Sequence, residues 1–355
     1  MKRLRAAILG AAPTSERHAQ PLQESGWVDV VAVMSRTPER MNKFADKFRI
    51  PGRYSDLDTL LKKEKPELVC ICSPTAFHYE QILACLRAGA NVLCEKPIAG
   101  SLEQLDGIQA VEKETGRWCS SIFQWRYGSG MGHLRKLSRA GVFGRFLLGV
   151  CHTLWLRDMV YYSNKFKGRW ATEQGGASVT LGIHALDAFL WVVGDWDEVS
   201  ADYGTLNHDI EVDDVAVAIM RFPNGARATL VNSSCSPRQE TYLRWDFQKA
   251  TVELRAHYSY HNKDWLVTPA DEKDGEPTRQ WQTLCADDLN NQGAQIRELL
   301  GQIQRNERPS TDVTEARRAI EFISCMYKSA ETRQVVRRGS ILPGDRFYRS
   351  MSGHV

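Results

Sequence analysis

The sequence lacks the patterns that mark disulfide-rich, metal-binding and nucleic-acid-binding proteins. Its nine cysteines show neither CxxC nor CxxH spacing, and Cys70, Cys72 and Cys94 lie inside apolar runs typical of buried strands. We therefore expect no disulfide framework, no bound metal, and a location in the reducing cytoplasm. The formal net charge is only +3, and no basic stretch contains interleaved aromatic residues, which argues against a nucleic-acid partner.

Long hydrophobic runs are also missing. No stretch approaches the roughly 18 consecutive apolar residues of a membrane helix, so we expect no membrane partner. The apolar run after the basic start breaks at Gly10 and Pro13, before a signal peptide could form. What the chain does have is an ordinary globular composition, with 43% hydrophobic and 25% charged residues among 355. A chain longer than roughly 250–300 residues is expected to form two domains.

Apolar strand-like runs alternate with helical stretches over the first 120 residues. The expected strands are Arg5–Gly10, Val28–Ser35, Leu68–Ser73 and Asn91–Glu95. The expected helices are His18–Ser25, Pro38–Phe48, Tyr54–Lys62, Tyr79–Ala88 and Leu102–Thr115. Because the apolar runs are continuous rather than alternating, we expect strands buried on both faces of a parallel sheet. The pattern predicts an α/β fold whose first domain, residues 1–120, is a doubly wound parallel sheet.

The pattern changes after about residue 120 to longer segments in which apolar and polar residues alternate. The expected strands are Phe146–Trp155, Glu198–Asn207, Asp213–Phe222, Ala226–Ser234, Glu240–Gln248 and Ala250–Ala256. The expected helices are Gly132–Ala140, one starting near Gly176, Asn290–Gln304 and Thr314–Thr332. Asn224-Gly225 is a strong hairpin signal between two of these strands. We predict an α+β domain, residues 121–355, built on a large, mostly antiparallel open sheet.

The first expected strand opens onto a loop that resembles a degenerate phosphate-binding loop. Gly10-Ala11-Ala12-Pro13-Thr14-Ser15 occupies the place of G-x-G-x-x-G but keeps only the first glycine. We predict that Gly10, Ala12, Pro13 and Thr14 bind a pyrophosphate through backbone N–H groups and the start of the next helix. The loop taken alone fits an ordinary strand-to-helix turn of any doubly wound domain equally well.

The end of the second expected strand carries no acid to hold a ribose 2′-hydroxyl. Ser35, Arg36 and Arg40 instead offer a hydroxyl and two guanidinium groups, which suit a 2′-phosphate. This favours NADP over NAD as the cofactor. The alternative is that Arg36 is a solvated residue at the start of a helix.

Two further strand ends carry residues typical of a ligand site. Ser73-Pro74-Thr75-Ala76-Phe77-His78 follows one strand and Cys94-Glu95-Lys96-Pro97 follows the next. Open α/β sheets bind their ligands at the carboxyl ends of their strands. A lysine there, preceded by an acid and followed by proline, has a constrained backbone and a partner for its ammonium group.

The run from Ala90 to Ala99, Ala-Asn-Val-Leu-Cys-Glu-Lys-Pro-Ile-Ala, closely resembles the signature of the glucose–fructose oxidoreductase / inositol dehydrogenase (Gfo/Idh/MocA) family. The resemblance extends from Ile8-Leu9-Gly10 into the second domain, and it departs from the family in the single glycine of the loop. It implies a Rossmann first domain that binds NAD or NADP, with Lys96 as the catalytic lysine beside the nicotinamide. The residues that it places around the cofactor are Ser73, Pro74, His78, Glu95, Pro97 and Gln124.

A polar stripe interrupts the apolar helix expected after Gly176. Thr180, His184 and Asp187 lie at positions i, i+4 and i+7 and would share one helix face. A lone helical histidine is more often structural, but a polar stripe in an apolar helix needs a reason. The segment resembles the family's second signature, in which His184 matches the catalytic histidine and Thr180 stands where an acid is usual. We therefore predict Lys96 and His184 as the acid–base pair, with Thr180 and Asp187 contacting substrate.

Aromatic and basic side chains precede this helix. Arg126, Trp155, Arg157, Tyr161 and Tyr162 are candidates for contacts with a sugar ring and its hydroxyl or acidic groups. The alternative for these residues is a place in the core, which base rates favour for at least half of them.

The expected activity is hydride transfer between NAD(P) and a secondary alcohol or ketone of a sugar, cyclitol or glycoside. Two alternatives stay open. One is a nicotinamide-using lyase or glycosidase that acts through a transient keto-sugar, and the other is a non-catalytic dinucleotide-binding sensor. By the resemblance, the open sheet of the second domain implies a homodimer or homotetramer.

Overall fold

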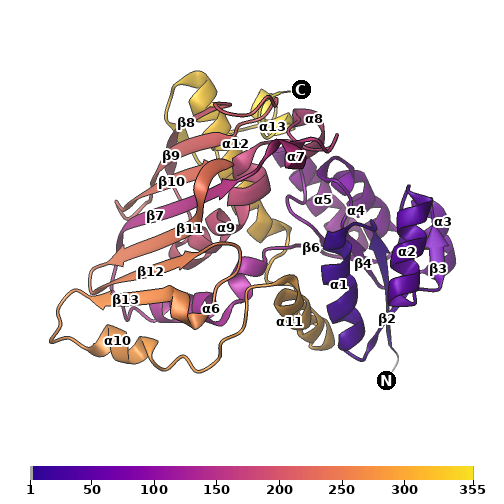
Figure 1. The fold of residues 1–355 in the computed structure, drawn as a ribbon, viewed down its shortest axis with the longest axis horizontal. Helices are drawn as coiled ribbons and strands as arrows, with labels where there is room; N and C mark the ends of the chain where they lie inside the picture. Colours follow the sequence, from indigo (N-terminus) through magenta and orange to yellow (C-terminus); the bar gives the residue numbers. More distant parts are fainter. Residues whose placement is uncertain (1–2, 355) are drawn as a thin grey trace. The chain divides into compact units, whose positions relative to one another are not determined.

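The computed structural model describes residues 3–354, and the chain divides into two compact units (Figure 1). The first unit runs to Ile122 and also contains Gln292–Arg317, while the second contains Phe123–Asn291 and the chain from Arg318 onward. The sequence predicts a boundary after residue 120, with all of residues 121–355 in the second domain. The structure instead returns a helical segment near the C-terminus to the first unit.

The first unit is built on a parallel sheet of six strands in the order β3-β2-β1-β4-β5-β6. The strands are β1 (Leu4–Leu9), β2 (Val28–Met34), β3 (Gly52–Tyr54), β4 (Leu68–Ile71), β5 (Asn91–Cys94) and β6 (Cys119–Ser121). Every ladder is parallel, and β4 is buried along its whole length, as continuous apolar runs predict. The doubly wound α/β prediction is confirmed. Strands β3 and β6 were missed because three residues are too few to show a period.

Helices cover the sheet of the first unit. They are α1 (Pro13–Glu24), α2 (Pro38–Phe48), α3 (Leu57–Glu64), the short 3₁₀ helix η1 (Thr75–Phe77), α4 (His78–Arg87), α5 (Leu102–Thr115) and α11 (Gln292–Gln304). Helix α11 buries Ile296, Leu299 and Leu300 in the same core as Ala19 and Leu22 of α1. An apolar stripe at this spacing must be covered, and the cover here is a helix remote in sequence. That packing explains why residues 292–317 belong to the first unit.

The second unit is built on a sheet of eight strands in the order β13-β12-β11-β7-β10-β9-β8-β14. The strands are β7 (Phe146–Leu156), β8 (Glu198–Gly204), β9 (Val215–Arg221), β10 (Arg227–Ser233), β11 (Cys235–Phe247), β12 (Ala250–Ala256), β13 (Trp265–Pro269) and β14 (Val336–Arg337). Only β7 and β10 pair in parallel, and the other ladders are antiparallel. The prediction of a large, mostly antiparallel sheet is confirmed, while β13 and β14 were missed.

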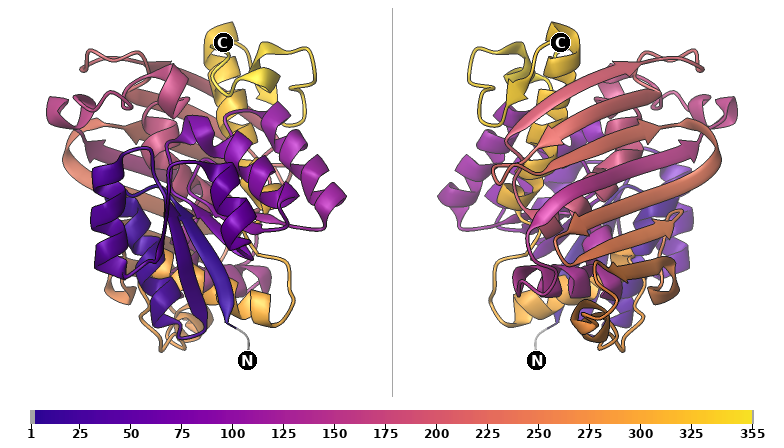
Figure 2. Two further views of the ribbon diagram at one scale, coloured as in Figure 1. Left: turned by 90° about the vertical axis from the view of Figure 1, so that its right-hand side faces the viewer. Right: turned by 90° about the vertical axis from the view of Figure 1, so that its left-hand side faces the viewer.

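One face of this sheet is covered by a helix and the other is open (Figure 2). Helix α9 (Ile183–Val193), preceded by the π-helical turn η3 (Ser178–Gly182), packs on the inner face. Gly149 of β7 permits this packing, because a Cβ atom there would lie 2.4 Å from the ring of Phe189. The outer face exposes Leu148, Val217 and Ile219.

The remaining helices of the second unit flank the sheet. They are η2 (Gln124–Tyr127), α6 (Ser129–Arg139), α7 (Met159–Tyr162), α8 (Trp170–Glu173), η4 (Asn262–Asp264), α10 (Glu276–Trp281), α12 (Val313–Thr332, which begins in the first unit) and α13 (Arg346–Arg349). Stacked rings fill the core beneath the sheet, with Trp245 nearly parallel both to Phe189 and to Trp265. The sheet therefore gives α9 a rigid support.

One stretch has the length and mean hydropathy of a membrane helix, although the sequence analysis expected none. It is Trp170–Val193, with a mean hydropathy of 1.5, and 83% of its most apolar window is buried inside the protein. Burial of this kind is typical of a core helix, which passes the same test of length and composition.

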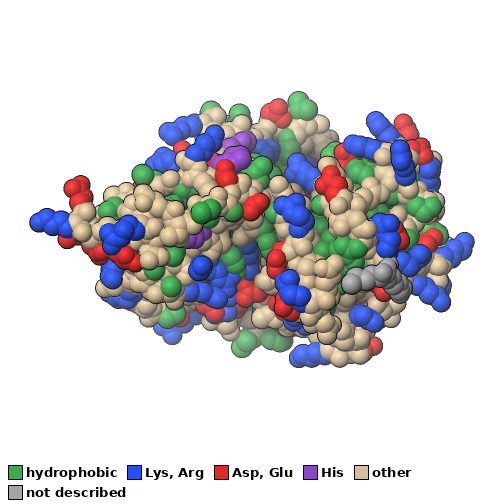
Figure 3. Space-filling view, turned by 90° about the horizontal axis from the view of Figure 1, so that it is seen from below, with side chains coloured by type: hydrophobic (Ala, Val, Ile, Leu, Met, Phe, Trp, Pro, Cys, Tyr) green, Lys and Arg blue, Asp and Glu red, His purple; other side chains and the backbone are tan. Residues whose placement is uncertain are grey.

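On the face shown in Figure 3, basic and acidic side chains are intermixed.

Candidate active site

The loop after β1 leads into a helix start without a side-chain cap and an unpartnered hydroxyl. Gly10 adopts φ +108°, and a Cβ atom there would lie 2.8 Å from the carbonyl oxygen of Cys72, so only glycine fits. Helix α1 begins at Pro13, and the side chain of Ala12 offers it no cap. Within residues 3–354 the buried hydroxyl of Ser15 has no hydrogen-bond partner. These donors at a helix N-terminus fit a pyrophosphate group.

The loop after β2 holds the residues predicted to select the cofactor. The backbone N–H of Ser35 donates to Tyr54 at 3.1 Å, and its hydroxyl accepts from the N–H of Thr37 at 3.3 Å. The guanidinium of Arg36 lies 4.3 Å from the centre of the Phe77 ring, so it stacks on the segment that follows β4. Arg40 is exposed in the first turn of α2. Both basic side chains lie at the strand end where they were expected.

His78 joins the two strand ends that carry the family signature. Its Nε2 lies 2.8 Å from the carbonyl oxygen of Ser73, and its Nδ1 lies 2.8 Å from that of Pro97. Burial lowers the pKa of His78, so the ring is neutral and donates to one of these two carbonyls at a time. Pro74 immediately precedes the short helix η1 that leads into His78. His78 therefore fixes the segment after β4 against the segment after β5.

A buried ion pair fixes Glu95 beside Lys96. His18, on the inward face of α1, places its Nε2 2.9 Å from Glu95 Oε1, and its side chain is fully buried. Burial alone would lower the pKa of His18, but Cys72 and Glu95 outweigh burial and raise it to about 10. The pKa of the Cys72 thiol is itself raised by burial, so Glu95 is the partner that carries charge at neutral pH.

The charge of Glu95 is stabilised from two sides. Burial would raise the pKa of Glu95, but His18 and Lys96 outweigh burial and lower it. Lys96 therefore lies next to an ionised carboxylate that is itself held by a charged imidazole. The sequence analysis missed His18, although its spacing from Ser15, Ala19 and Leu22 places it on the buried face of α1.

In the second unit, His184 lies in the first turn of α9 and is 5% exposed. The turn before it is π-helical, so Thr180 does not keep the regular α-helical spacing to His184 that was expected. The hydroxyl of Thr180 donates to the carbonyl of Gly176 at 2.9 Å. Gly176 itself is packed so tightly that a Cβ atom would lie 1.8 Å from the carbonyl oxygen of Asp213. The helix start is thus fixed by backbone contact.

Arg126 and Asp187 form an ion pair one turn beyond His184. The Nε of Arg126 donates to Asp187 Oδ2 at 2.7 Å and its Nη2 to Oδ1 at 2.5 Å, and both side chains are 1% exposed. Removing one partner of such a pair leaves a buried charge and typically costs about 3–5 kcal/mol. The pair therefore locks η2 against α9. The predicted contacts of both residues with substrate stay predictions.

The aromatic candidates divide between core and surface. Trp155 is 3% exposed, and its Nε1 donates to Thr241 at 3.0 Å, as the core alternative predicts. Tyr161 and Tyr162 are half-buried, and the Tyr162 hydroxyl donates to Ser234 at 2.9 Å. Gln124, expected near the cofactor, belongs to the second unit, where its amide donates to the hydroxyl of Tyr258 at 3.2 Å.

Two adjacent buried carboxylates that the sequence analysis missed hold these segments in place. Asp213 accepts from the backbone N–H groups of Gly176 and Ser178, at the start of the helix that carries His184. Asp214 accepts from three successive N–H groups, those of Leu206, Asn207 and His208. Burial would raise the pKa of Asp214, but these bonds outweigh burial and lower it. Adjacent acids at a strand start were the only available signal, since sequence does not reveal their burial.

The His18–Glu95 pair predicts a pH dependence of stability. Because Glu95 holds the folded-state pKa of His18 above its unfolded value of 6.5, the contribution of His18 to stability is complete below pH 6.5 and is lost as the pH rises through the raised folded-state pKa. His18→Gln keeps an amide donor but does not titrate. Thermal unfolding midpoints should show wild type losing its advantage over His18→Gln across this range. Parallel curves for the two proteins would contradict the assignment of a charged His18.

Comparisons with known proteins match both halves of the chain. Residues 4–123 match a family profile described as an oxidoreductase family with an NAD-binding Rossmann fold, and residues 131–270 match the GFO/IDH/MocA C-terminal domain. D-glucoside 3-dehydrogenase of Escherichia coli K12 is 30% identical over 195 residues, 54% of each chain. Myo-inositol 2-dehydrogenase of Thermotoga maritima is 24% identical, covering 65% of this chain and 68% of that protein.

Solved structures extend the likeness to the whole fold. The WlbA dehydrogenase of Bordetella pertussis, solved with NADH and UDP-GlcNAcA, has a TM-score of 0.84 at 21% identity, covering 95% of this chain and 98% of that chain. The chain matches only about half the length of the glucoside dehydrogenase, so the likeness at the sequence level is strongest in part of the chain. The two profiles together nevertheless span most of the sequence. The chain belongs to the Gfo/Idh/MocA oxidoreductase family.

Proposed function

We propose that the protein transfers a hydride between NAD(P) and a secondary alcohol or ketone of a sugar, cyclitol or glycoside. The proposal rests on the segment that follows β5. There Lys96 comes directly after Glu95, and Glu95 is paired with the buried His18. A lysine fixed beside a carboxylate at the ligand-binding edge of a parallel sheet is suited to proton transfer. Two relatives are named as dehydrogenases of a glucoside and of myo-inositol, which supports this class of substrate.

The residues of the first unit fit a dinucleotide. When bound, the nicotinamide ring accepts or returns the hydride. Gly10 allows close approach of the backbone, and the uncapped start of α1 with the Ser15 hydroxyl offers donors to the phosphates. Ser73 and Pro97, joined by His78, frame the remaining edge of the site.

We assign proton transfer to Lys96 and His184, acting together as an acid–base pair. Lys96 directly follows Glu95 and lowers the pKa of that carboxylate, and His184 follows a helix start that Asp213 fixes. Because the Thr180 hydroxyl donates its hydrogen bond to the carbonyl oxygen of Gly176, we assign it an acceptor role toward a substrate hydroxyl. Arg126 and Asp187 are given the supporting role of holding α9 in place.

We also propose that the protein works in the cytoplasm. All nine cysteines are free thiols, and seven of them are buried. Burial raises the pKa of Cys70 to about 12, which keeps its thiol protonated and unreactive. This use of cysteine as a small core residue suits a reducing compartment.

The proposed function predicts net reduction of NAD or NADP by members of a panel of sugars, cyclitols and glycosides. Lys96→Met should abolish turnover and leave cofactor binding intact, and His184→Ala should lower the rate by roughly 10²–10⁴-fold. The double variant should be little worse than Lys96→Met, since residues that act as a unit are not additive.

Lys63→Met, at an exposed lysine of α3, serves as the matched control and should keep full activity. Near-wild-type rates in Lys96→Met would refute the assignment of the catalytic lysine. Substrate consumption without net NADH or NADPH would instead point to the lyase or glycosidase alternative.

A preference for NADP is assigned to Arg36. Replacing Arg36 with Ala removes a charge-assisted contact available only to the 2′-phosphate, so NADP affinity should fall by roughly 1.5–3 kcal/mol while NAD affinity hardly changes. Titration of both cofactors measures this difference, with Lys43→Ala on the exposed face of α2 as the control. Equal losses for both cofactors would mean that Arg36 serves only to stack on Phe77.

The open face of the second unit's sheet supports a homodimer or homotetramer. Leu148, Val217 and Ile219 are 48%, 42% and 53% exposed, and the ladders place the valine and isoleucine beside Val231 and Thr229. This apolar centre is flanked by ion-paired side chains such as Arg244–Asp246, the composition of an interface core and its rim. A second copy of the chain is the proposed occupant.

Light scattering of the purified protein should give the mass of two or four chains. Ile219→Glu should shift the mass toward one chain, because a charge would be buried in the interface. Leu342→Glu, at a residue 62% exposed outside the sheet face, is the control and should leave the mass unchanged. A monomeric wild type, or an Ile219→Glu variant with an unchanged mass, would contradict this interface.

A further inference from the structure

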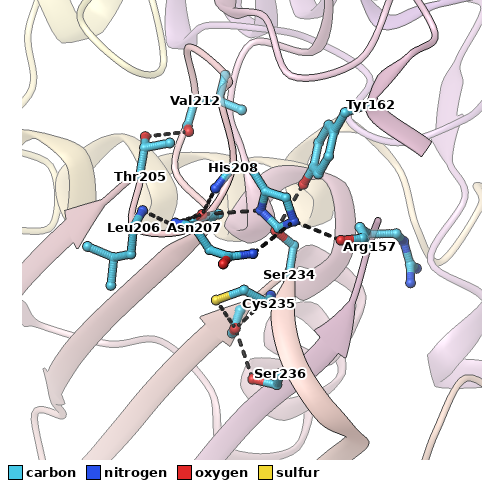
Figure 4. Close-up of polar contacts among 12 residues, drawn as sticks. Arg157, Tyr162, Thr205, Leu206, Asn207, His208, Val212, Ser234, Cys235 and Ser236 are labelled. Atoms are coloured by element: carbon cyan, nitrogen blue, oxygen red, sulfur yellow. Dashed lines mark hydrogen bonds and ion pairs between the residues drawn. The ribbon is translucent and has the colours of Figure 1, made fainter. Parts of the chain in front are cut away.

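Arg157, directly after β7, is anchored at both ends of its backbone. Its N–H donates to the carbonyl of Ser234 at 2.7 Å, and its carbonyl oxygen lies 2.8 Å from Nε2 of His208 (Figure 4). The other ring nitrogen of His208 lies 3.2 Å from the carboxylate of Asp214. A carboxylate that orients the imidazole in this way fixes which nitrogen faces Arg157. The position of Arg157 is therefore determined by buried groups, although it follows a strand end.

The side chain of Arg157 is also held, but its charge is not neutralised. Its guanidinium centre lies 5.1 Å from the ring of Trp155 and 5.3 Å from that of Tyr161, and its Nη1 donates to the carbonyl of Leu156 at 2.8 Å. Across residues 3–354 no carboxylate lies within ion-pair distance of it, and its other nitrogens have no hydrogen-bond partner. Aromatic faces fix the fork while leaving its donors available.

Two other cationic side chains of the second unit differ from Arg157 because each has a carboxylate partner. Lys167, whose Nζ lies 4.9 Å from the centre of the Tyr161 ring, is paired with Glu173 at 2.6 Å. Arg126, the buried guanidinium of this unit, is paired with Asp187 through two bonds. The guanidinium of Arg157 is therefore held in place, half-buried and available to bind an anion.

Arg157 follows the end of β7 that is nearer to η3, the turn that leads into the His184 helix. In the ladder, Thr153 of β7 pairs with Asn232, whose amide donates to Ser178 at the start of η3 at 3.1 Å. Trp155 lies two residues further along the same inner face, and Arg157 follows it. The adjacent carboxylates Asp213 and Asp214 bind the helix start and the His208 segment, respectively.

We propose that Arg157 binds the carboxylate of a sugar acid, which makes uronic or aldonic acids and their glycosides the preferred substrates. This inference rests on the proposed function. A guanidinium presents two parallel N–H donors that match the two oxygens of a carboxylate. One uncompensated positive charge balances one carboxylate, whereas a phosphate dianion would call for further donors.

Steady-state rates with D-glucuronate and D-galacturonate, compared with D-glucose and D-galactose, test the inference. Wild type should show a kcat/KM for the acids at least about 10-fold above that for the neutral sugars. Arg157→Met should lower kcat/KM for the acids by roughly 10–100-fold and leave the neutral sugars little affected. Arg157→Lys, which keeps the charge but not the fork, should fall between the two.

Arg169→Met, at an exposed arginine of the same connecting segment, is the matched control and should keep the preference for acids. Calorimetric titration of the cofactor-loaded protein with D-glucuronate gives a second readout that does not depend on turnover. An equal response to acids and neutral sugars, or a preference that survives in Arg157→Met, would overturn the inference. If the protein reduces neither NAD nor NADP with any alcohol of the wider panel, the proposed function itself would be refuted.

Discussion

Two adjacent carboxylates, Asp213 and Asp214, fix the positions of the two backbone segments around the second unit's site. Both are fully buried, and each is satisfied largely by backbone N–H groups rather than by a basic side chain. Bonds from N–H groups to a carboxylate are charge-assisted and contribute roughly 1.5–3 kcal/mol each. Because the two residues are neighbours in the chain, the start of the His184 helix and the His208 segment are held by one short rigid piece of backbone.

The first unit positions its site residues through a close backbone contact and a buried ion pair. Its backbone at Gly10 lies against Cys72, where no side chain fits, and its Glu95 is held by the imidazole of His18 from the neighbouring helix. Lys96 then follows a carboxylate that cannot rotate away. In both units the residues assigned to chemistry are positioned by buried polar groups in low-dielectric surroundings, where each hydrogen bond is strong and an unpaired group is costly.

Sequence reasoning succeeded where a local pattern determines the structure. The parallel sheet followed from continuous apolar runs, and Lys96 was placed at a strand end by the Glu-Lys-Pro signature. It failed where a contact joins residues far apart in the chain, since nothing local pairs His18 with Glu95 or Arg126 with Asp187. The same reason explains why α11 was assigned to the second domain.

Local irregularity was the other source of error. The π-helical turn at Ser178–Gly182 shifts Thr180 from the face expected of a regular α-helix, and no residue pattern announces such a turn. Gly176, which precedes this turn, is packed tightly on Asp213, and only the structure reveals this contact. The roles proposed for Thr180 and Asp187 therefore depend on geometry more than on the signature.

The proposed activity depends on direct hydride transfer between the reacting carbon of the substrate and the nicotinamide. The most direct test uses the best substrate of the panel with deuterium at that carbon, followed by mass spectrometry and NMR of the reduced cofactor. One deuterium atom should appear at C4 of the reduced nicotinamide, and the rate should be slower than with the unlabelled substrate. Loss of the deuterium to water, with the cofactor free of label, would contradict it.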